Sequence, residues 1–202
     1  METLPRNRRN RPSHPVSGVR FSLKRQYVCR GVFPAMLILC LVSSHAGAWP
    51  DRLEGHGGPV RGIAVSAERS ELLSASFDYA IIHRSLTSSH SAILHRLFGH
   101  EAAVNDVAFV PGRPLAVSAS DDGSVGVWNL DEGALVTRFR DTGDKILDVT
   151  VSDDGAVTAS AGWDHTARVY DLESLTERAV MRGHDGNVNT VALAGEGNIL
   201  YS

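Results

Sequence analysis

The feature that most constrains this chain is a set of residue markers that recur every 42 to 44 residues. Gly-His pairs begin at Gly55, Gly99 and Gly183, with spacings of 44 and 84 residues, and the second spacing is twice 42. Other markers keep the same period, namely Ser74, Ser118, Ser160 and Ser202, and Asp78, Asp122 and Asp164. Independent markers with one period indicate structural repeats, each of which buries its apolar faces only against its neighbours.

The second repeat is the clearest guide to the structure of one unit. Four short apolar runs over residues 104–109, 115–120, 124–128 and 134–139 are separated by turns rich in Gly, Pro and Asp. This is the pattern of four short strands. One of the turns, Asp121-Asp122-Gly123, offers a glycine for a positive φ. Four strands in a period of 42 residues are typical of one β-propeller blade.

We therefore predict an all-β fold, a partial β-propeller of about 3.5 four-stranded antiparallel blades. The propeller fragment is expected over residues 49–202, with blades near 55–98, 99–142, 143–182 and 183–202. The last blade is expected to be incomplete, because Ser202 falls at the serine marker of a second strand. We expect the natural product to continue for several more repeats, and residues 49–202 alone to associate through open strand edges such as 188–193.

The second repeat also carries the residues by which the chain resembles the WD-repeat β-propeller family. They are Gly99-His100, Ser118, Ser120, Asp122 and Trp128-Asn129, the last standing where the family has Trp-Asp. The resemblance covers residues 50–202. It implies a buried hydrogen-bonded tetrad made of His100, Asp122, Trp128 and either Ser118 or Ser120. Both serines fall on one face of an alternating strand, so alternation leaves the choice open.

The other repeats depart from this pattern. The first has Arg84 in the place of Trp, and the third has Asp144 in the place of His and Tyr170 in the place of Trp. The resemblance therefore implies only partial tetrads there, from His56, Ser74, Ser76, Asp78, Ser160, Asp164, Tyr170 and His184. Such a network would pin the loop between blades to the strands while leaving no polar atom unpaired.

The resemblance also implies a partner-binding face at one end of the blades. In the family this face is formed by the start of each first strand and by the residue before the turn Asp. Here these positions are Arg61, Asn105, Leu147 and Asn189, and Phe77, Asp121 and Trp163. Phe77 and Trp163 are large aromatic groups of the kind that anchors interfaces. For Trp163 an equal alternative is packing against the next blade.

Residues 1–48 form a segment outside the repeats. Eight basic residues and one acid precede an uncharged apolar run over 32–42, and Ala46-Gly47-Ala48 follows. This order is that of a secretory signal peptide, here cleaved after Ala48; the alternative is an apolar strand or helix of the fold. The run is too short to cross a bilayer, so no stable membrane span is expected after cleavage. We predict an exported protein of the bacterial periplasm.

Charge and residue types argue against several functions. Residues 1–48 hold eight of the 20 basic and one of the 23 acidic residues, which leaves a formal charge of −10 on residues 49–202 and disfavours nucleic-acid binding. Both cysteines, Cys29 and Cys40, fall in the leader, so the rest can form no disulfide. Ser, His and Asp recur with the repeat, which indicates a structural role, and no G-x-S-x-G motif is present. We therefore predict that the chain is not an enzyme.

No metal or cofactor is expected in these residues. The remaining histidines lack metal-ligand spacing and are expected to be exposed polar surface, and they are His83, His90, His95 and His165. The sequence favours a non-catalytic scaffold for a protein partner. The alternative rests on resemblance, because the blades are similar to those of bacterial exported proteins in which a propeller is joined to a c-type cytochrome domain. These residues hold no C-x-x-C-H motif, so a haem domain would lie downstream.

Overall fold

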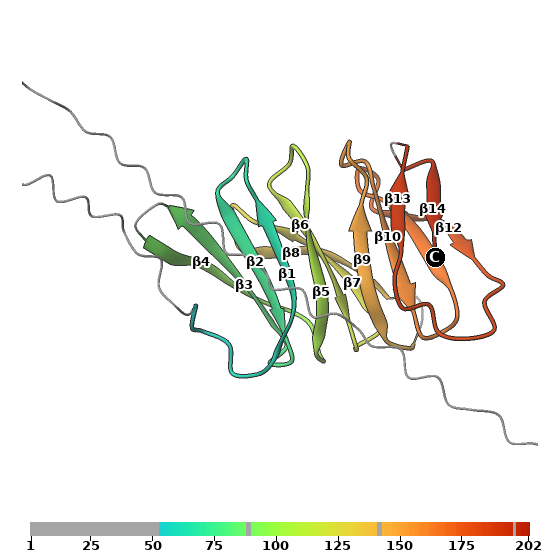
Figure 1. The fold of residues 1–202 in the computed structure, drawn as a ribbon, viewed down its shortest axis with the longest axis horizontal. Helices are drawn as coiled ribbons and strands as arrows, with labels where there is room; N and C mark the ends of the chain where they lie inside the picture. Colours follow the sequence, from blue (N-terminus) through green and yellow to red (C-terminus); the bar gives the residue numbers. More distant parts are fainter. Residues whose placement is uncertain (1–52, 88–89, 141–142, 196) are drawn as a thin grey trace, which may run out of the picture. The chain divides into compact units, whose positions relative to one another are not determined.

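The computed structural model describes residues 53–87, 90–140, 143–195 and 197–202 (Figure 1), which belong to one compact unit. The predicted leader, residues 1–48, lies outside them. Every regular element of the described residues is a β-strand, so the all-β prediction is confirmed. None of these residues forms a helix that is long and apolar enough to cross a membrane.

The strands form three four-stranded antiparallel sheets and one two-stranded sheet, which we call blades one to four. Blade one contains β1 (Val60–Ser66), β2 (Glu71–Ser76), β3 (Ala80–Thr87) and β4 (His90–Phe98). Blade two contains β5 (Val104–Val110), β6 (Leu115–Ser120), β7 (Ser124–Asn129) and β8 (Ala134–Arg140). Blade three contains β9 (Ile146–Val151), β10 (Val157–Gly162), β11 (Ala167–Asp171) and β12 (Thr176–Met181). Blade four contains β13 (Ala192–Ala194) and β14 (Ile199–Tyr201).

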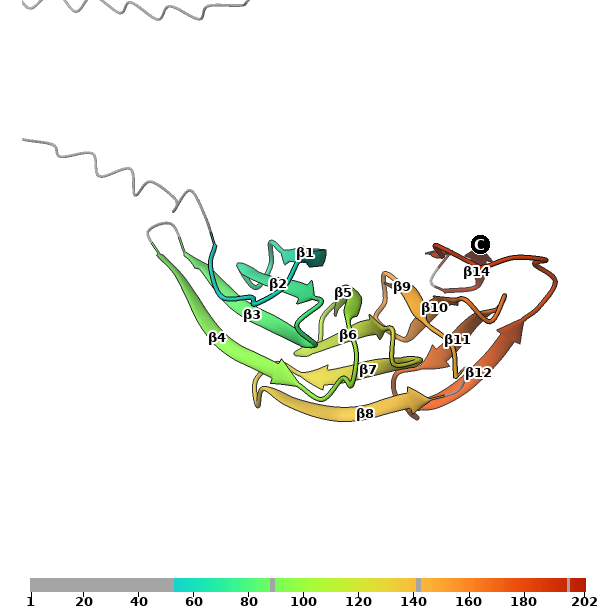
Figure 2. The same cartoon turned by 90° about the horizontal axis from the view of Figure 1, so that it is seen from below.

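The hydrophobic core lies between neighbouring blades. Leu73 and Ile81 of blade one pack in one cluster with Val107 and Trp128 of blade two. A second cluster joins blade two to blade three, and a third joins blade three to the residues of blade four. Figure 2 shows the first strands β1, β5 and β9 in one row and the last strands β4, β8 and β12 in another. The short strands therefore bury their faces by stacking sheet on sheet.

One strand position is buried or exposed according to whether a neighbouring blade covers it. Val107 of β5 is 3% exposed because it packs against blade one. Ile63 holds the equivalent position 44 residues earlier, in β1, and it is 64% exposed. The apolar character of this position is thus a property of the repeat, and its burial depends on the neighbour.

Blade four differs from the strand expected over residues 188–193, because β13 begins only at Ala192. The backbone before it is bound to blade three instead. The N–H of Val188 donates to the carbonyl of Gly162 over 3.1 Å, and the N–H of Val191 donates to Oδ2 of Asp148 over 2.8 Å. These bonds hold residues 188–191 in an irregular backbone conformation.

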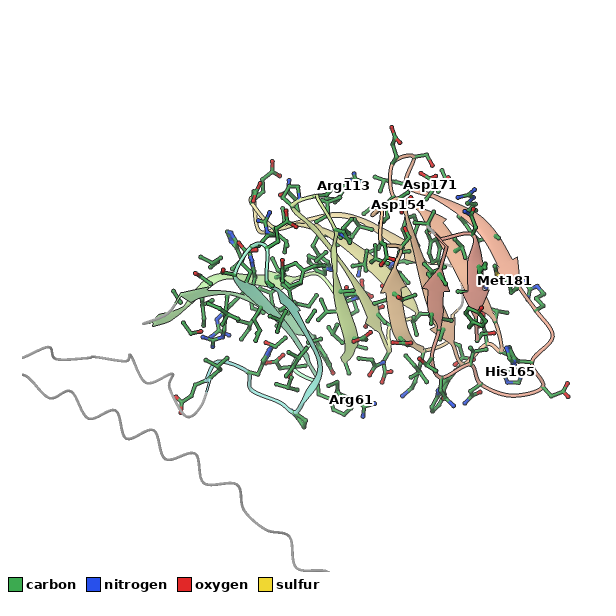
Figure 3. All side chains as sticks on the ribbon, turned by 45° about the horizontal axis from the view of Figure 1, so that its top comes forward. Arg61, Arg113, Asp154, His165, Asp171 and Met181 are labelled. Carbon is green, nitrogen blue, oxygen red and sulfur yellow. The ribbon has the colours of Figure 1, made fainter. Side chains whose placement is uncertain are left out.

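The loops and turns lie at two opposite ends of the strands. Figure 3 shows Arg61 and His165 at one end and Arg113, Asp154 and Asp171 at the other. The first of these ends carries the loops between blades and the turns between second and third strands, so the residues of interest are found there.

Candidate functional site

A buried chain of hydrogen bonds crosses blade two. The ring of His100 lies 2.9 Å from Oδ2 of Asp122 through Nδ1, and 2.7 Å from Oγ of Ser118 through Nε2. The indole N–H of Trp128 donates to the same Oγ over 2.8 Å. The Asp122 carboxylate can only accept, so Nδ1 of His100 carries a hydrogen and donates it to Oδ2. In the neutral form of the ring Nε2 then accepts the hydrogen of the Ser118 hydroxyl, whose oxygen accepts the Trp128 N–H.

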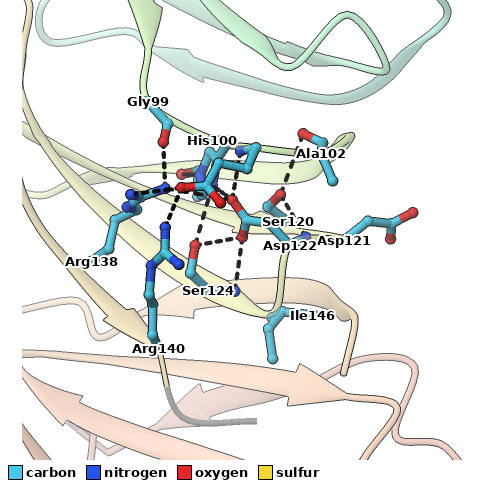
Figure 4. A network of polar contacts seen from close by, with 12 residues as sticks. Gly99, His100, Ala102, Ser120, Asp121, Asp122, Ser124, Arg138, Arg140 and Ile146 are labelled. Carbon is cyan, nitrogen blue, oxygen red and sulfur yellow. Dashed lines mark hydrogen bonds and ion pairs between the residues drawn. The ribbon is translucent and has the colours of Figure 1, made fainter. Parts of the chain in front are cut away.

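The geometry distinguishes the two serines that alternation leaves equivalent. Ser118 carries the bonds to the histidine and the indole. The Oγ of Ser120 instead donates to the carbonyl of Ala103 over 3.0 Å and accepts the N–H of Asp122 over 3.1 Å. It also lies 3.4 Å from the carbonyl of Ala102 (Figure 4). Ser76 accepts the N–H of the turn aspartate in blade one in the same way. The second serine of each pair therefore shapes the turn and stays outside the tetrad.

Asp122 is the acceptor on which the network of blade two converges. Burial alone would raise the pKa of its carboxyl, but hydrogen bonds from His100, from the Ser124 hydroxyl and from the backbone N–H of Glu101 outweigh this effect. Together they hold the pKa of Asp122 well below its usual range. The hydroxyl of Ser124 donates to Oδ1 of Asp122 over 2.5 Å (Figure 4). The guanidinium of Arg140 donates to the exposed carboxylate of Glu101, also over 2.5 Å.

Blade one brings three of the four tetrad positions together. Nδ1 of His56 lies 3.0 Å from Oδ2 of Asp78, and Nε2 lies 2.8 Å from Oγ of Ser74. Arg84 stands in the place of the tryptophan and donates to the carbonyl of Glu54. It therefore binds the loop directly rather than through the serine.

Blade three uses a different network, built on Arg168. The guanidinium donates to Oδ2 of Asp164 and to Oε2 of Glu177, each over 2.9 Å, and the side chain of Arg168 is 9% exposed. The hydroxyl of Thr166 donates to Asp164 over 2.7 Å, as its counterpart does in blade two. Ser160 lies opposite Arg168 in the sheet, and its buried Oγ has no hydrogen-bond partner among the described residues.

The remaining predicted tetrad positions of blades three and four form no complete tetrad among the described residues, although His184 and Ser202 repeat the contact of His100 with Ser118. Tyr170 is buried and stacks on Phe139 of blade two, with a ring-centroid distance of 4.3 Å. Asp144 is exposed. Nε2 of His184 lies 2.7 Å from Oγ of Ser202 in an exposed pair. The repeat markers do not predict Arg168; the one available signal is a charged residue inside the apolar alternation of a third strand.

Two aromatic rings at the end that carries Arg61 each have a cation above them. The guanidinium carbon of Arg61 lies 5.2 Å from the ring centroid of Phe77. Nζ of Lys145 lies 5.0 Å from the ring of Trp163. Phe77 is 41% exposed and Trp163 is 39% exposed, so both rings remain open to solvent. Among the other predicted members of this face, Leu147 is half-buried and Asn189 is exposed.

Polar groups of blade two and of the start of blade three belong to the same end of the strands. Nζ of Lys145 lies 2.9 Å from Oδ2 of Asp121, and Nδ2 of Asn105 donates to Oδ1 of the same carboxylate over 2.7 Å. Asn105 also donates to the carbonyl of Ile146 over 2.8 Å and is 6% exposed. The Asn105 side chain is therefore committed to bonds within blade two and across to blade three, while Asp121 remains partly exposed.

Tyr79 and His165 also belong to this end, although the repeat markers do not predict them. Each follows the turn aspartate, and their φ angles are +69° and +65°. This conformation is costly for a residue with a Cβ, and blade two has Gly123 there with φ +77°. Tyr79 is 51% exposed. Strain of this kind clusters at binding sites, and the signal in the sequence is a large ring where the turn favours glycine.

One histidine contradicts the expectation of exposed polar surface. His83 is 1% exposed, so that prediction is wrong for it. Its Nε2 lies 3.0 Å from Oε2 of Glu71, its ring stacks on His95 at 5.7 Å, and burial lowers the pKa of His83. The side chain of His90 lies outside the described residues. In the part of the chain that the structure describes, no group of three or more His, Cys, Asp or Glu side chains could hold a metal ion.

Two segments of the described sheets match a known protein family. The WD40 family, described as WD domain, G-beta repeat, matches residues 91–129 and 133–171. The chain contains WD40 repeats. Each match runs from the fourth strand of one blade to the third strand of the next, so it crosses a junction between blades. The stacked four-stranded sheets are consistent with a partial β-propeller built of such repeats.

The chain is also similar to segments of two larger proteins. It is 34% identical over 76 residues to guanine nucleotide-binding protein subunit beta-like protein 1 of Mus musculus, which covers 36% of this chain and 23% of that protein. It is 46% identical over 46 residues to ASTRA-associated protein 1 of Aspergillus flavus, which covers 23% of this chain and 11% of that protein. The chain thus spans less than a quarter of either relative. Proteins with WD40 repeats are typically non-catalytic scaffolds for protein interactions.

Proposed function

We propose that this chain is a non-catalytic scaffold that binds a protein partner through a binding face made of Arg61, Phe77, Tyr79, Asp121 and Trp163. The observation that carries the proposal is the pair of half-exposed rings of Phe77 and Trp163, each with a cation above it. Aromatic side chains and arginine are the commonest anchors of protein interfaces. The WD40 repeats support a scaffold role for the surrounding blades.

The arrangement of the binding face supports recognition of one partner in one orientation. Blades one and three contribute exposed rings, and Asp121 of blade two forms an ion pair with Lys145, which directly precedes β9 of blade three. Apolar anchors supply most of the affinity of an interface, whereas charged groups fix the register of the partner. The backbone of Tyr79 takes a strained turn conformation in the free chain, and strain of this kind clusters at binding sites.

The chemistry of the tetrads supports binding rather than catalysis. Ser118 is fully buried, and its Oγ is occupied by Trp128 and His100. A nucleophile must reach its substrate, and this hydroxyl cannot do so while the blade is folded. The bonds from His56 to Asp78 and Ser74 repeat the arrangement in blade one. A structural element recurs with each blade, whereas a catalytic centre is needed only once.

We further propose export to the bacterial periplasm, on the basis of the order of basic, apolar and A-x-A segments in residues 1–48. N-terminal sequencing of the mature protein is expected to begin at Trp49, and a mature chain that still starts at Met1 would contradict export. In this compartment a specific alternative is an accessory domain beside a c-type cytochrome domain. The partner of the binding face would then be a haem protein.

Photocrosslinking tests the binding face in the full chain, expressed in its own organism. The photoreactive residue p-benzoylphenylalanine replaces Phe77 or Trp163, and the matched control replaces Val136, which is 46% exposed on β8. We expect the first two positions to form a covalent adduct with the same protein and the control to form none. Haem staining of the adduct distinguishes a cytochrome from other partners. Equal adducts at all three positions, or none at 77 and 163, would refute the proposed face.

A further inference from the structure

Polar side chains lie inside blade one at positions where the next blade is apolar, and neither the tetrads nor the binding face uses them. They are Glu71 of β2 and His83 of β3. His83 follows Ile81 by two residues, so it lies on the face of β3 that packs against blade two. In blade two the same repeat positions, 44 residues later, hold Leu115 and Val127, which pack in the apolar cluster with blade three. The first junction between blades therefore contains polar groups where the second has apolar packing.

One carboxylate oxygen of Glu71 joins these polar groups to blade two. Nε2 of His83 lies 3.0 Å from Oε2 of Glu71, and Nε of Arg69 donates to the same oxygen over 2.6 Å. The guanidinium of Arg69 also donates to Oδ1 of Asp131, in the turn after β7, over 3.2 Å. The contacts therefore run from the interior of blade one to the turn between β7 and β8 of blade two.

A second histidine reaches the same turn of blade two. His95 of β4 stands opposite His83 in the sheet, and the two rings stack with their centroids 5.7 Å apart. Gly133 has φ +64°, and a Cβ added there would overlap the half-buried ring of His95. The turn that binds Arg69 through Asp131 thus also packs against His95. We call Arg69, Glu71, His83, His95 and Asp131 the polar cluster.

The surroundings of His83 suit a neutral ring and not a charged one. The residue is 1% exposed, and neither ring nitrogen has a well-aligned hydrogen-bond partner among the described residues. The carboxylate of Glu71 can only accept, so the hydrogen of the neutral ring is on Nε2, which makes the close contact. A second proton would go to the buried Nδ1 and leave an N–H there without an acceptor, which is costly.

The charges around His83 also oppose its protonation. Among the described residues, Glu71 faces it from β2, His95 from β4 and Arg69 from the turn before β2, while Asp131 of blade two faces Arg69. The negative charge of Glu71 is already shared with Arg69. Burial, together with the nearby His95 and Arg69, lowers the pKa of His83 against the opposing contact and charge of Glu71.

We propose that the polar cluster is an acid-sensitive contact between blades one and two, which holds while His83 is neutral and weakens when His83 takes up a proton from solvent. The protonated ring competes with Arg69 for Oε2 of Glu71. Arg69 then loses the contact that positions it on Asp131, and the junction loosens. The junction of blades two and three has apolar residues at these positions, so it lacks this response.

The direction of the pH effect follows from the lowered pKa of His83. A histidine in an unfolded chain has a pKa of about 6.5. As the pH falls below about 6.5, the unfolded state therefore binds a proton that the folded state still excludes, and the free energy of unfolding decreases. The contribution of His83 to stability is complete above about pH 7.5 and is lost progressively as the pH falls toward the pKa of the folded state.

The first test follows the imidazole resonances of the histidines by NMR in the full chain of 202 residues, from pH 8 down to pH 5. His165, which is exposed in the turn between β10 and β11, is the matched control. We expect His83 to remain neutral at the pH where His165 is half protonated. A midpoint of His83 at or above that of His165 would overturn the proposal.

A second test separates protonation from simple packing. The side chain of His83→Gln can donate an amide N–H to Glu71, but it does not titrate. We expect the thermal midpoint of the wild type to fall by about 3 °C or more from pH 7.5 to pH 5.5 relative to that of His83→Gln. His165→Gln should follow the wild type. If His83→Gln and the wild type keep a constant difference over this range, the proposal is wrong; if the variant does not fold, the NMR midpoint decides.

Backbone hydrogen exchange tests whether acid acts at this junction. The exchange of β3 in blade one is compared with that of β11 in blade three at pH 7.5 and pH 5.5, after correction for the pH dependence of the intrinsic rate. We expect the protection of β3 to decrease relative to that of β11 in the wild type, and to keep its ratio in His83→Gln. Equal losses in the two strands of the wild type would contradict an acid-sensitive contact between blades one and two.

Discussion

Blades two and three both anchor a turn aspartate, but they do so with different residues. In blade two His100 binds Asp122 and passes the connection on to Ser118. In blade three a guanidinium, that of Arg168, binds Asp164 directly. In both blades the hydroxyl two residues after the aspartate also donates to it. The comparison shows that the aspartate is the fixed element of this repeat, and that its partner can change.

The two arrangements exclude each other at one position of the third strand. Gly126 stands opposite Ser118, and a Cβ there would lie 2.8 Å from Oγ of Ser118 and 2.9 Å from Nε1 of Trp128. Arg168 stands opposite Ser160 at the corresponding position, 42 residues later. Glycine at this position leaves room for the complete tetrad of blade two, whereas Arg168 fills it in blade three. Blade one has Ile82 there and forms the contacts of His56 with Ser74 and Asp78 without an indole.

The largest effect is expected from Arg168→Ala. The change leaves the carboxylates of Asp164 and Glu177 without their common cation, in a site where the arginine side chain is 9% exposed. Breaking a buried ion pair in this way should lower the free energy of unfolding by about 3 kcal/mol. Arg178→Ala, at an exposed position of β12, is the matched control and should cost less than about 0.5 kcal/mol. Urea denaturation measures both, and equal costs would show that Arg168 does not anchor blade three.

A smaller effect is expected from Asp122→Ala in blade two. The change leaves His100 without its acceptor in a buried site, where the cost of an unpaired polar group is about 1–3 kcal/mol. Asp153→Ala lies in an exposed turn and should change the free energy of unfolding by less than about 0.5 kcal/mol. If the two variants were equally stable in urea, the tetrad of blade two would not be contributing to the fold.

Much of the fold could be predicted because turn chemistry and strand alternation are local properties. The four strands expected in the second repeat agree with β5, β6, β7 and β8 to within one residue at each end. Gly123 adopts the positive φ that its turn requires. The stacking of blades follows in turn, because a sheet of such short strands must bury its faces against another sheet.

The parts that could not be predicted depend on side chains that meet across strands or blades. Alternation leaves Ser118 and Ser120 equivalent, and only the approach of the His100 ring separates them. Asn105 occupies a predicted position of the binding face, but its amide is buried by a bond to the next blade. His83 is drawn into a polar cluster inside blade one. None of these contacts recurs with the period of the repeat, so the repeat markers do not predict them.

The smallest effects on the free energy of unfolding are expected from two serines at the same repeat position. They are Ser118 and Ser160, which are 0% and 1% exposed. Ser118→Ala leaves the indole N–H of Trp128 and Nε2 of His100 without their common partner in a buried site and should cost about 1–2 kcal/mol. The hydroxyl of Ser160 has no hydrogen-bond partner among the described residues, so its burial is uncompensated. Ser160→Ala should therefore change the free energy of unfolding by less than about 0.5 kcal/mol, or increase it. Urea denaturation of both variants makes the comparison. A cost at Ser160 as large as that at Ser118 would mean that the hydroxyl of Ser160 is bound in solution, and that blades two and three differ less than their networks indicate.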